Sequence, residues 1–224
     1  MEPSSRPRVA GASRTVLFSL GAVLVLAAFG LGAVIFTRDS PFGIDIWWND
    51  LMGASASPIL TGYSRVMNVL GGTWFGVLAV PILGAIALIV AKRPWSAAFF
   101  LTAEAASAGM VQVLKHLFGR VRPEEIIVVT DYGSFPSGHV ANAATIATVA
   151  VLLFPKLWVL LVGIGWVFLM ALSRTALHAH WLSDTLGGAL IGIGVALIVA
   201  GFFAPMLARE RPAAQPAPLA KLSE

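Results

Sequence analysis

Residues 132–139 read Tyr-Gly-Ser-Phe-Pro-Ser-Gly-His and place a turn, a helix start and a titratable ring in succession. Pro136 disfavours helix at Phe135 and Ser137 is a favourable N-cap, so we expect a helix to begin at about Ser137 and to continue through the apolar run that follows. The free N–H groups at a helix start, together with the positive end of the helix dipole, bind anions. His139 lies in the first turn beside that point, which favours phosphate chemistry. A capped transmembrane helix with an interfacial histidine is the alternative.

The composition is that of an integral membrane protein. Hydrophobic residues make up 58% of the chain and charged residues 12%, far from the balance of a soluble domain. The 224 residues suffice for six spans of about 20 residues with short connections, so we expect a single domain. The net charge of +4 comes from basic residues scattered between apolar runs, which argues against a nucleic-acid partner. The absence of cysteine excludes disulfides and a thiolate metal site.

Six apolar runs predict an all-α polytopic membrane protein, a bundle of six transmembrane helices. The runs lie at residues 15–36, 73–91, 96–114, 138–154, 157–172 and 184–203. The polar segment 1–14 and the Pro- and Ala-rich segment 205–224 are predicted to be disordered ends of the domain formed by residues 15–204. The segment 37–72 mixes tryptophans with polar residues, which indicates an amphipathic or re-entrant segment that covers the site or gates a lipid.

Basic residues assign the two sides of the membrane. With the N-terminus inside, the inner segments contain nine Lys and Arg residues and the outer segments six. This bias agrees with the excess of positive charge on the cytoplasmic side of membrane proteins. Both chain ends are then cytoplasmic in a cell membrane. The segments 115–139 and 173–184, which contain nearly all the unusual chemistry, fall on the outer face.

Three cations of these two segments are candidates to bind phosphate: Lys115, Arg122 and Arg174. A single cation at the end of a transmembrane helix is commonly an interfacial anchor, but several cations with histidines on one face favour anion binding. A phosphoryl group in transfer carries charge on its equatorial oxygens, which fixed guanidinium and ammonium groups stabilise. Arg binds such oxygens through two hydrogen bonds, and Lys acts as a point charge.

His180 and Asp184 are the candidate nucleophile and its partner. If the last helix begins early, they lie one turn apart on one face, where the carboxylate holds one ring nitrogen protonated and leaves the other free to attack. His139 would protonate the leaving oxygen and later activate water. This scheme needs no metal or other cofactor. Three loop carboxylates on the same face could hold Mg²⁺ but are interpreted as solvated charges. They are Glu124, Glu125 and Asp131.

Three motifs in this order resemble the signature of the type 2 phosphatidic acid phosphatase superfamily. They are Lys115, six residues and Arg122-Pro123; Pro-Ser-Gly-His at residues 136–139; and Ser173-Arg174, five residues, His180, three residues and Asp184. The resemblance implies a six-helix membrane core and hydrolysis of a lipid phosphate at the outer face through a phosphohistidine, without metal. It implies that His180 attacks, that Asp184 orients it and that His139 is acid and base. The phosphate ligands that it implies are Lys115, Arg122, Ser137, Gly138 and Arg174.

One position departs from the family pattern. Members often have Gly two residues before the histidine of the third motif, where this chain has His178. We assign His178 no catalytic role and expect a packing or rim residue. His116 and Arg120 are likewise expected at the membrane interface or at the rim of the site, not among the groups that bind phosphate.

The helix predicted for residues 96–114 has a polar stripe. At ~100° per residue, Glu104, Gln112 and Lys115 fall within an arc of roughly 80°, with Ser107 beside it. An ionisable group at that depth normally faces the bundle interior. Glu104 is therefore expected either to line a substrate cavity or proton path, or to fix helix packing as a protonated or hydrogen-bonded carboxyl.

The expected function is that of a membrane lipid-phosphate phosphatase. By resemblance, polyprenyl (undecaprenyl) pyrophosphate is the preferred substrate, followed by phosphatidylglycerophosphate and phosphatidic acid. A phosphotransferase would use the same phosphohistidine with an alcohol acceptor. A non-catalytic lipid-phosphate carrier would have no use for the spacing of His180 and Asp184, which argues against it. The expected partners are the bilayer and a lipid phosphate, and the oligomeric state is not predicted.

Overall fold

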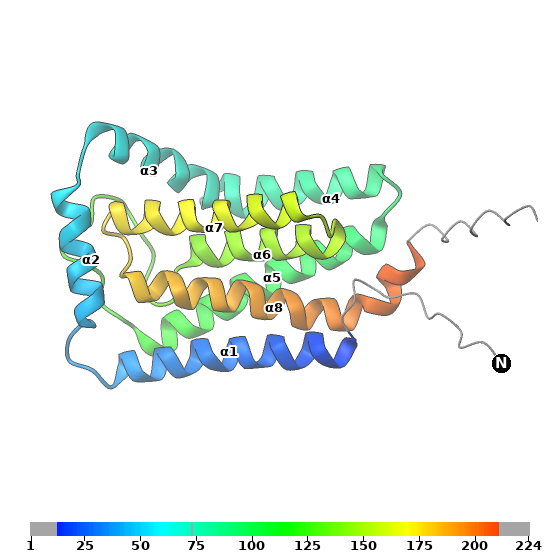
Figure 1. Ribbon diagram of the computed structural model, residues 1–224, viewed down its shortest axis with the longest axis horizontal. Helices are drawn as coiled ribbons and strands as arrows, with labels where there is room; N and C mark the ends of the chain where they lie inside the picture. Colours follow the sequence, from blue (N-terminus) through cyan, green and yellow to red (C-terminus); the bar gives the residue numbers. More distant parts are fainter. Residues whose placement is uncertain (1–12, 73, 211–224) are drawn as a thin grey trace, which may run out of the picture.

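The computed structural model describes residues 13–72 and 74–210. Figure 1 shows a bundle of helices aligned with one another, with α2 across one end. The helices are α1 (Arg14–Phe36), α2 (Gly43–Ala54), α3 (Pro58–Gly71), the π-helix η1 (Phe75–Ala79), α4 (Val80–Val90), α5 (Pro94–Phe118), α6 (Gly138–Leu153), α7 (Leu157–Ala176) and α8 (Leu182–Arg209). These two ranges contain no strand, so the predicted all-α class is confirmed. Most of the predicted disordered ends, at 1–12 and 211–224, lies outside the described residues.

Four helices in the described ranges are long and apolar enough to cross a membrane: α1, α5, α7 and α8. The bent pair formed by α3 with η1 and α4 counts as a fifth span if its two halves cross together. α6 is apolar, but with 16 residues it is shorter than the helices that are long enough to cross a membrane. The chain is thus a multi-pass membrane protein. The lengths and apolar composition of the described helices do not confirm the predicted count of six spans.

α8 is the centre of the bundle. It packs against α1, α5 and α6, and side chains on its inner side, such as Ile191 and Ala196, are fully buried. Large apolar side chains on the outer faces of the bundle are instead exposed, for example Leu26, Val90 and Val162. An apolar surface of this extent suits contact with lipid rather than with water.

Two glycines let α8 approach α6 closely. A Cβ at Gly188 would overlap the carbonyl oxygen of Ser137, and one at Gly192 would overlap that of Ala141. Small residues at a helix interface allow such backbone contact in membranes. The Ser137 N–H also donates to the Asp184 carbonyl oxygen at 3.0 Å. The anion-binding turn predicted at the start of α6 is therefore held against the first turn of α8.

The segment 37–72 forms two helices. α2 lies across one end of the bundle and packs against α7 and α8, while α3 packs along α7 (Figure 1). α3 begins after the N-cap Ser57, whose Oγ accepts a hydrogen bond from the Leu60 N–H at 3.2 Å, and has Pro58 in its first turn. The segment thus covers the end of the bundle at which α8 begins.

α8 continues past the point at which the tail was predicted to begin. It includes Pro205 and ends at Arg209. The carboxylate of Glu210 accepts hydrogen bonds from the Ser96 N–H at 3.0 Å, from Ser96 Oγ at 2.7 Å and from the Trp95 N–H. The N–H groups at the start of a helix have no partner within the helix. Here their partner is Glu210, which is too distant in sequence for a local pattern to predict the contact. The start of α5 thus binds the residue that follows the last turn of α8.

Candidate active site

Lys115 and Arg122 converge on one point. Lys115 lies in the last turn of α5, which ends at Gly119 in the left-handed conformation (φ 52°) that favours glycine. Lys115 Nζ and Arg122 Nη2 each donate to the Gly133 carbonyl oxygen at 2.7 Å. Only 2% and 11% of the two side chains are exposed. Burial lowers the pKa of Arg122, but a guanidinium stays charged at neutral pH. The first motif therefore builds a positively charged wall.

Asp131 lies between these two cations. Its Oδ1 is 3.1 Å from Lys115 Nζ and 3.0 Å from Arg122 Nη2. The interpretation of Asp131 as a solvated loop charge is therefore wrong, although half of the side chain is exposed. Of the other two loop carboxylates, Glu124 is exposed and Glu125 accepts a hydrogen bond from a side-chain amide of α2. Within the described ranges, no three His, Asp or Glu side chains form a group that could hold a metal ion.

Arg174 and Ser137 have buried polar atoms without a hydrogen-bond partner among the described residues. Arg174, in the last turn of α7, donates from Nη1 to Asn68 Oδ1 at 2.5 Å, while its Nε has no partner. Ser137 is the N-cap of α6 by position, as predicted, but its Oγ forms no capping hydrogen bond and has no partner either. Buried polar groups are normally satisfied, so these two donors indicate a binding function. An anion with several acceptor oxygens would satisfy both donors.

His180 lies just before α8, and a backbone carbonyl orients its ring. Its Nδ1 is 2.7 Å from the Ser134 carbonyl oxygen, which can only accept, so Nδ1 carries the proton and Nε2 keeps its lone pair. Nε2 lies 3.3 Å from Arg122 Nη1. Burial lowers the pKa of His180 to about 3, so the ring is neutral at pH 7. Asp184 Oδ2 is 3.6 Å from Nδ1, one turn away as predicted, but the hydrogen bond that orients the ring goes to Ser134.

Asp184 is part of a buried network of ion pairs. It accepts hydrogen bonds from the Trp181 N–H at 2.8 Å and from Arg120 Nη1 at 2.5 Å. Arg120 Nη2 in turn donates to Asp45 Oδ2 in α2 at 2.7 Å. The Arg120 side chain is only 7% exposed, so the prediction of an interfacial or rim group is wrong for Arg120, whereas His116 is exposed. Sequence analysis missed Asp45, because no motif includes it.

Replacing Asp45 with Asn is expected to lower the free energy of unfolding by about 3 kcal/mol, because the change breaks a buried ion pair. Asp45 also accepts hydrogen bonds from the Ser183 N–H at 2.8 Å and from Ser183 Oγ at 2.7 Å. Thermal unfolding of the detergent-purified protein measures the effect. Asp50→Asn is the matched control, since Asp50 is exposed on the same helix. Equal melting temperatures of the two variants would contradict this role of Asp45.

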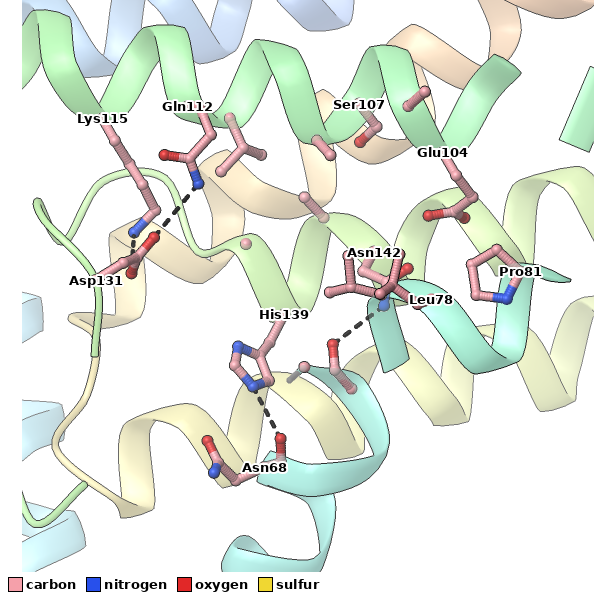
Figure 2. A pocket seen from close by; sticks show the side chains of 18 of the residues that line it. Asn68, Leu78, Pro81, Glu104, Ser107, Gln112, Lys115, Asp131, His139 and Asn142 are labelled. Atoms are coloured by element: carbon pink, nitrogen blue, oxygen red, sulfur yellow. Dashed lines mark hydrogen bonds and ion pairs between the residues drawn. The ribbon is translucent and has the colours of Figure 1, made fainter. Parts of the chain in front are cut away.

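His139 lies in the first turn of α6 and is oriented by α3. Its Nε2 is 3.1 Å from the Asn68 carbonyl oxygen (Figure 2), so Nε2 carries a proton and Nδ1 is the nitrogen left for a ligand. Asn68 thereby contacts two predicted site residues, because its side chain also accepts from Arg174. Sequence analysis missed Asn68, whose only signal is an amide within an amphipathic segment.

His178 lies apart from Lys115, Arg122 and Arg174, which together form the cation cluster of the site. Its backbone has a φ of 52°, in the left-handed region that favours glycine. Its Nδ1 is 2.7 Å from Asn49 Oδ1 in α2, and its side chain is buried. These contacts fit the packing role expected for His178.

The variant His178→Gly is expected to keep roughly half or more of the wild-type kcat/KM, since glycine adopts this backbone conformation without strain. The lost hydrogen bond to Asn49 lies outside the group that would bind phosphate. Steady-state phosphate release measures the outcome, and the melting temperature shows whether the variant is folded. A folded but inactive protein would mean that His178 takes part in the chemistry.

A cavity of about 720 Å³ extends from the cation cluster along α5. Its polar end is lined by Lys115, Asp131, Gly138, His139, Arg174 and His180. Its apolar walls come from η1, α4 and α5 and include Leu78, Pro81 and Leu101 (Figure 2 labels the first two). Leu78 and Leu101 are 56% and 41% exposed on the outside of the bundle, so the cavity borders the lipid-facing surface. Such a shape suits a ligand with an anionic head and an apolar chain.

Glu104 lines the far part of this cavity (Figure 2). It precedes Lys115 by 11 residues on the same helix, a distance of about 16 Å along the axis. Its Oε1 is buried without a hydrogen-bond partner in the described part of the chain. The predicted polar stripe thus faces the cavity, which fits the interpretation of Glu104 as part of the cavity wall. The alternative, that Glu104 fixes helix packing through a hydrogen bond, is not supported for its Oε1, which forms none in the described part of the chain.

Comparisons with known proteins find relatives for most of the chain. The protein-family model of the PAP2 superfamily matches residues 96–205, which contain all the predicted site residues. Decaprenylphosphoryl-5-phosphoribose phosphatase of Mycobacterium tuberculosis is 34% identical over 148 residues, which are 63% of this chain and 80% of that protein. Lipid A 1-phosphatase of Porphyromonas gingivalis is 38% identical over 87 residues, which are 38% of this chain and only 19% of that protein. The crystal structure of a transmembrane PAP2 type phosphatidylglycerolphosphate phosphatase from Bacillus subtilis superposes with a TM-score of 0.75 at 25% identity, over 85% of this chain and 98% of that one.

Proposed function

The chain belongs to the PAP2 superfamily and is a membrane phosphatase of lipid phosphates, and we propose that it hydrolyses polyprenyl pyrophosphate through a phosphohistidine on His180. The observation that carries this proposal is the position of His180 Nε2, which is unprotonated and accepts a hydrogen bond from Arg122 Nη1 at 3.3 Å at the polar end of an apolar cavity. The similarity to a decaprenylphosphoryl-5-phosphoribose phosphatase supports a polyprenyl chain in that cavity.

In the first step, His180 Nε2 attacks the terminal phosphorus, and the bond from that phosphorus to the bridging oxygen breaks. His139 enters this step as an imidazolium, with Nε2–H on the Asn68 carbonyl and a second proton, taken up with the substrate, on Nδ1; it gives the Nδ1 proton to the leaving oxygen. The Nδ1–H of His180 stays bound to the Ser134 carbonyl, with the Asp184 carboxylate nearby to stabilise the positive charge that develops on the ring. Charge on the equatorial oxygens is stabilised by five groups. They are Lys115, Arg122, Arg174, the Ser137 hydroxyl and the Gly138 N–H.

In the second step, water replaces the histidine. His139, which has lost its proton, takes one from the water molecule as the water oxygen attacks phosphorus. The bond between phosphorus and His180 Nε2 breaks, orthophosphate forms, and both histidines return to their starting states. The phosphorylated lipid product retains one phosphate when the substrate is a pyrophosphate.

We place the active site on the outer face of a cell membrane, with both chain ends in the cytoplasm. The start of α1 and the end of α8 lie at the same end of the bundle, and α2 lies at the opposite end (Figure 1). The site is at the α2 end of the bundle, because Lys115 and Arg174 lie in the last turns of α5 and α7. The excess of Lys and Arg in the segments on the side of the chain ends supports this orientation.

Phosphatidylglycerophosphate is the second candidate substrate, because the similar crystal structure is that of a phosphatidylglycerolphosphate phosphatase. Phosphatidic acid follows as a simpler phosphomonoester. A phosphotransferase would form the same phosphohistidine and pass the phosphoryl group to an alcohol instead of water. The position of His180 argues against a carrier without catalysis, since a carrier needs no neutral nucleophile.

The test is phosphate release by the detergent-purified protein in excess chelator from polyprenyl pyrophosphate, phosphatidylglycerophosphate and phosphatidic acid. We expect release from all three, with the highest kcat/KM for polyprenyl pyrophosphate. A higher value for another substrate would refute the proposed lipid. Consumption of the lipid without free orthophosphate, in the presence of an alcohol, would show a phosphotransferase.

A further inference from the structure

The carboxylate of Asp131 lies where an anionic ligand of Lys115 and Arg122 would bind. Its Oδ1 is shared by Lys115 Nζ at 3.1 Å and Arg122 Nη2 at 3.0 Å, and its Oδ2 lies 3.4 Å from Gln112 Nε2. Figure 2 shows the carboxylate beside Lys115 and Gln112 at the polar end of the cavity. One oxygen that bridges two cations, with the second oxygen near an amide donor, resembles one edge of a bound phosphate group.

Asp131 is charged at neutral pH. Burial by itself would raise its pKa, but Lys115, Gln112 and Arg122 outweigh that effect and hold the pKa below its ordinary value. The same two cations that would bind a substrate phosphate are therefore already neutralised in part by a group of the protein.

Asp131 is also the partner of these cations that is most easily displaced. It lies in the loop between α5 and α6, and 53% of its side chain is exposed. The carboxylates of the neighbouring buried ion pairs, Asp45 and Asp184, have no exposed side-chain area. Because the Asp131 side chain is half exposed, its carboxylate regains hydration when it turns toward solvent, while an incoming phosphate replaces it on the two buried cations.

We propose that Asp131 sets the affinity of the phosphate site by competing with phosphate for Lys115 and Arg122. The inference rests on the proposed function, because it assigns the substrate phosphate to these two cations. The competition lowers the affinity for every phosphate by the same factor. A lipid phosphate offsets this loss through its chain in the apolar cavity, whereas orthophosphate has no chain. Asp131 thus keeps the free product from occupying the site.

The variant Asp131→Asn is expected to bind inorganic phosphate about 3- to 10-fold more tightly than the wild type, because a half-exposed competing charge is removed. Calorimetric titration of the detergent-purified protein with inorganic phosphate measures this without turnover. Inhibition of lipid-phosphate hydrolysis by inorganic phosphate should strengthen by the same factor, and the KM should fall. The matched control is Glu124→Gln, which neutralises an exposed carboxylate of the same loop and should change neither value.

The proposal is overturned if Asp131→Asn keeps the wild-type melting temperature but binds phosphate no more tightly. Asp131→Ser repeats the test with another neutral side chain if the Asn variant does not fold. Asp131→Glu keeps the charge and should bind phosphate as the wild type does; tight binding by this variant would also contradict the competition. Tighter phosphate binding by Asp131→Asn, with no hydrolysis of any lipid phosphate by the wild type, would refute the proposed function and leave the competition intact.

Discussion

Replacing His180 with Ala is expected to lower kcat for every lipid phosphate by at least about 10³-fold, as expected for the loss of a nucleophile. Nε2 of His180 is the unprotonated ring nitrogen, because the Ser134 carbonyl accepts a hydrogen bond from the N–H at Nδ1. Alanine leaves Lys115, Arg122 and Arg174 in place, so binding of the substrate should change far less than turnover. Steady-state phosphate release under saturating substrate measures kcat directly.

His116→Ala is the matched control for this prediction, since His116 is an exposed histidine at the end of α5. It should retain nearly all activity. A second readout is trapping of the intermediate: the wild type, quenched in alkali after reaction with a ³²P-labelled substrate, should contain an alkali-stable, acid-labile label that is absent from His180→Ala. A labelled His180→Ala protein, or one that retains substantial turnover, would assign the nucleophile to another residue.

The start of α6 is the part of the fold that local sequence predicts best. The helix expected from residues 138–154 is observed as Gly138–Leu153, because Pro136 and Ser137 act within one turn of the chain. The spacing of the motifs also predicts that the residues of the cation cluster lie together. Lys115 is placed by the end of α5 and Arg174 by the end of α7, and both line one cavity with His180.

The groups that orient the site could not be predicted in the same way. Ser134 binds His180 through a backbone carbonyl, which has no side-chain signature. Asn68 and Asp45 come from the segment 37–72, and their contacts depend on how α2 and α3 fold onto helices that are distant in sequence. Arg120 resembled an anchor because it follows a transmembrane helix, and its burial becomes evident only with α2 in place.

Replacing His139 with Ala is expected to affect the substrates unequally. A phosphomonoester such as phosphatidic acid has an alkoxide leaving group that needs a proton, so loss of the general acid should cost about 10²- to 10⁴-fold in kcat. The leaving group of polyprenyl pyrophosphate is itself a phosphate and needs less assistance, so its loss should be closer to about 10-fold, the cost of unassisted attack by water. The measurement is phosphate release from both substrates by the same preparation of His139→Ala.

The ratio of the two losses is the decisive quantity, because any fraction of misfolded protein cancels from it. His139 contacts Asn68 in α3, so its removal could loosen that helix, and a loss of structure would reduce both activities alike. Equal losses on the two substrates would therefore refute His139 as the acid and make it a residue that positions α3. A loss at least about tenfold larger on the monoester would instead place the proton of His139 on the leaving oxygen, since the ratio then reflects leaving-group chemistry.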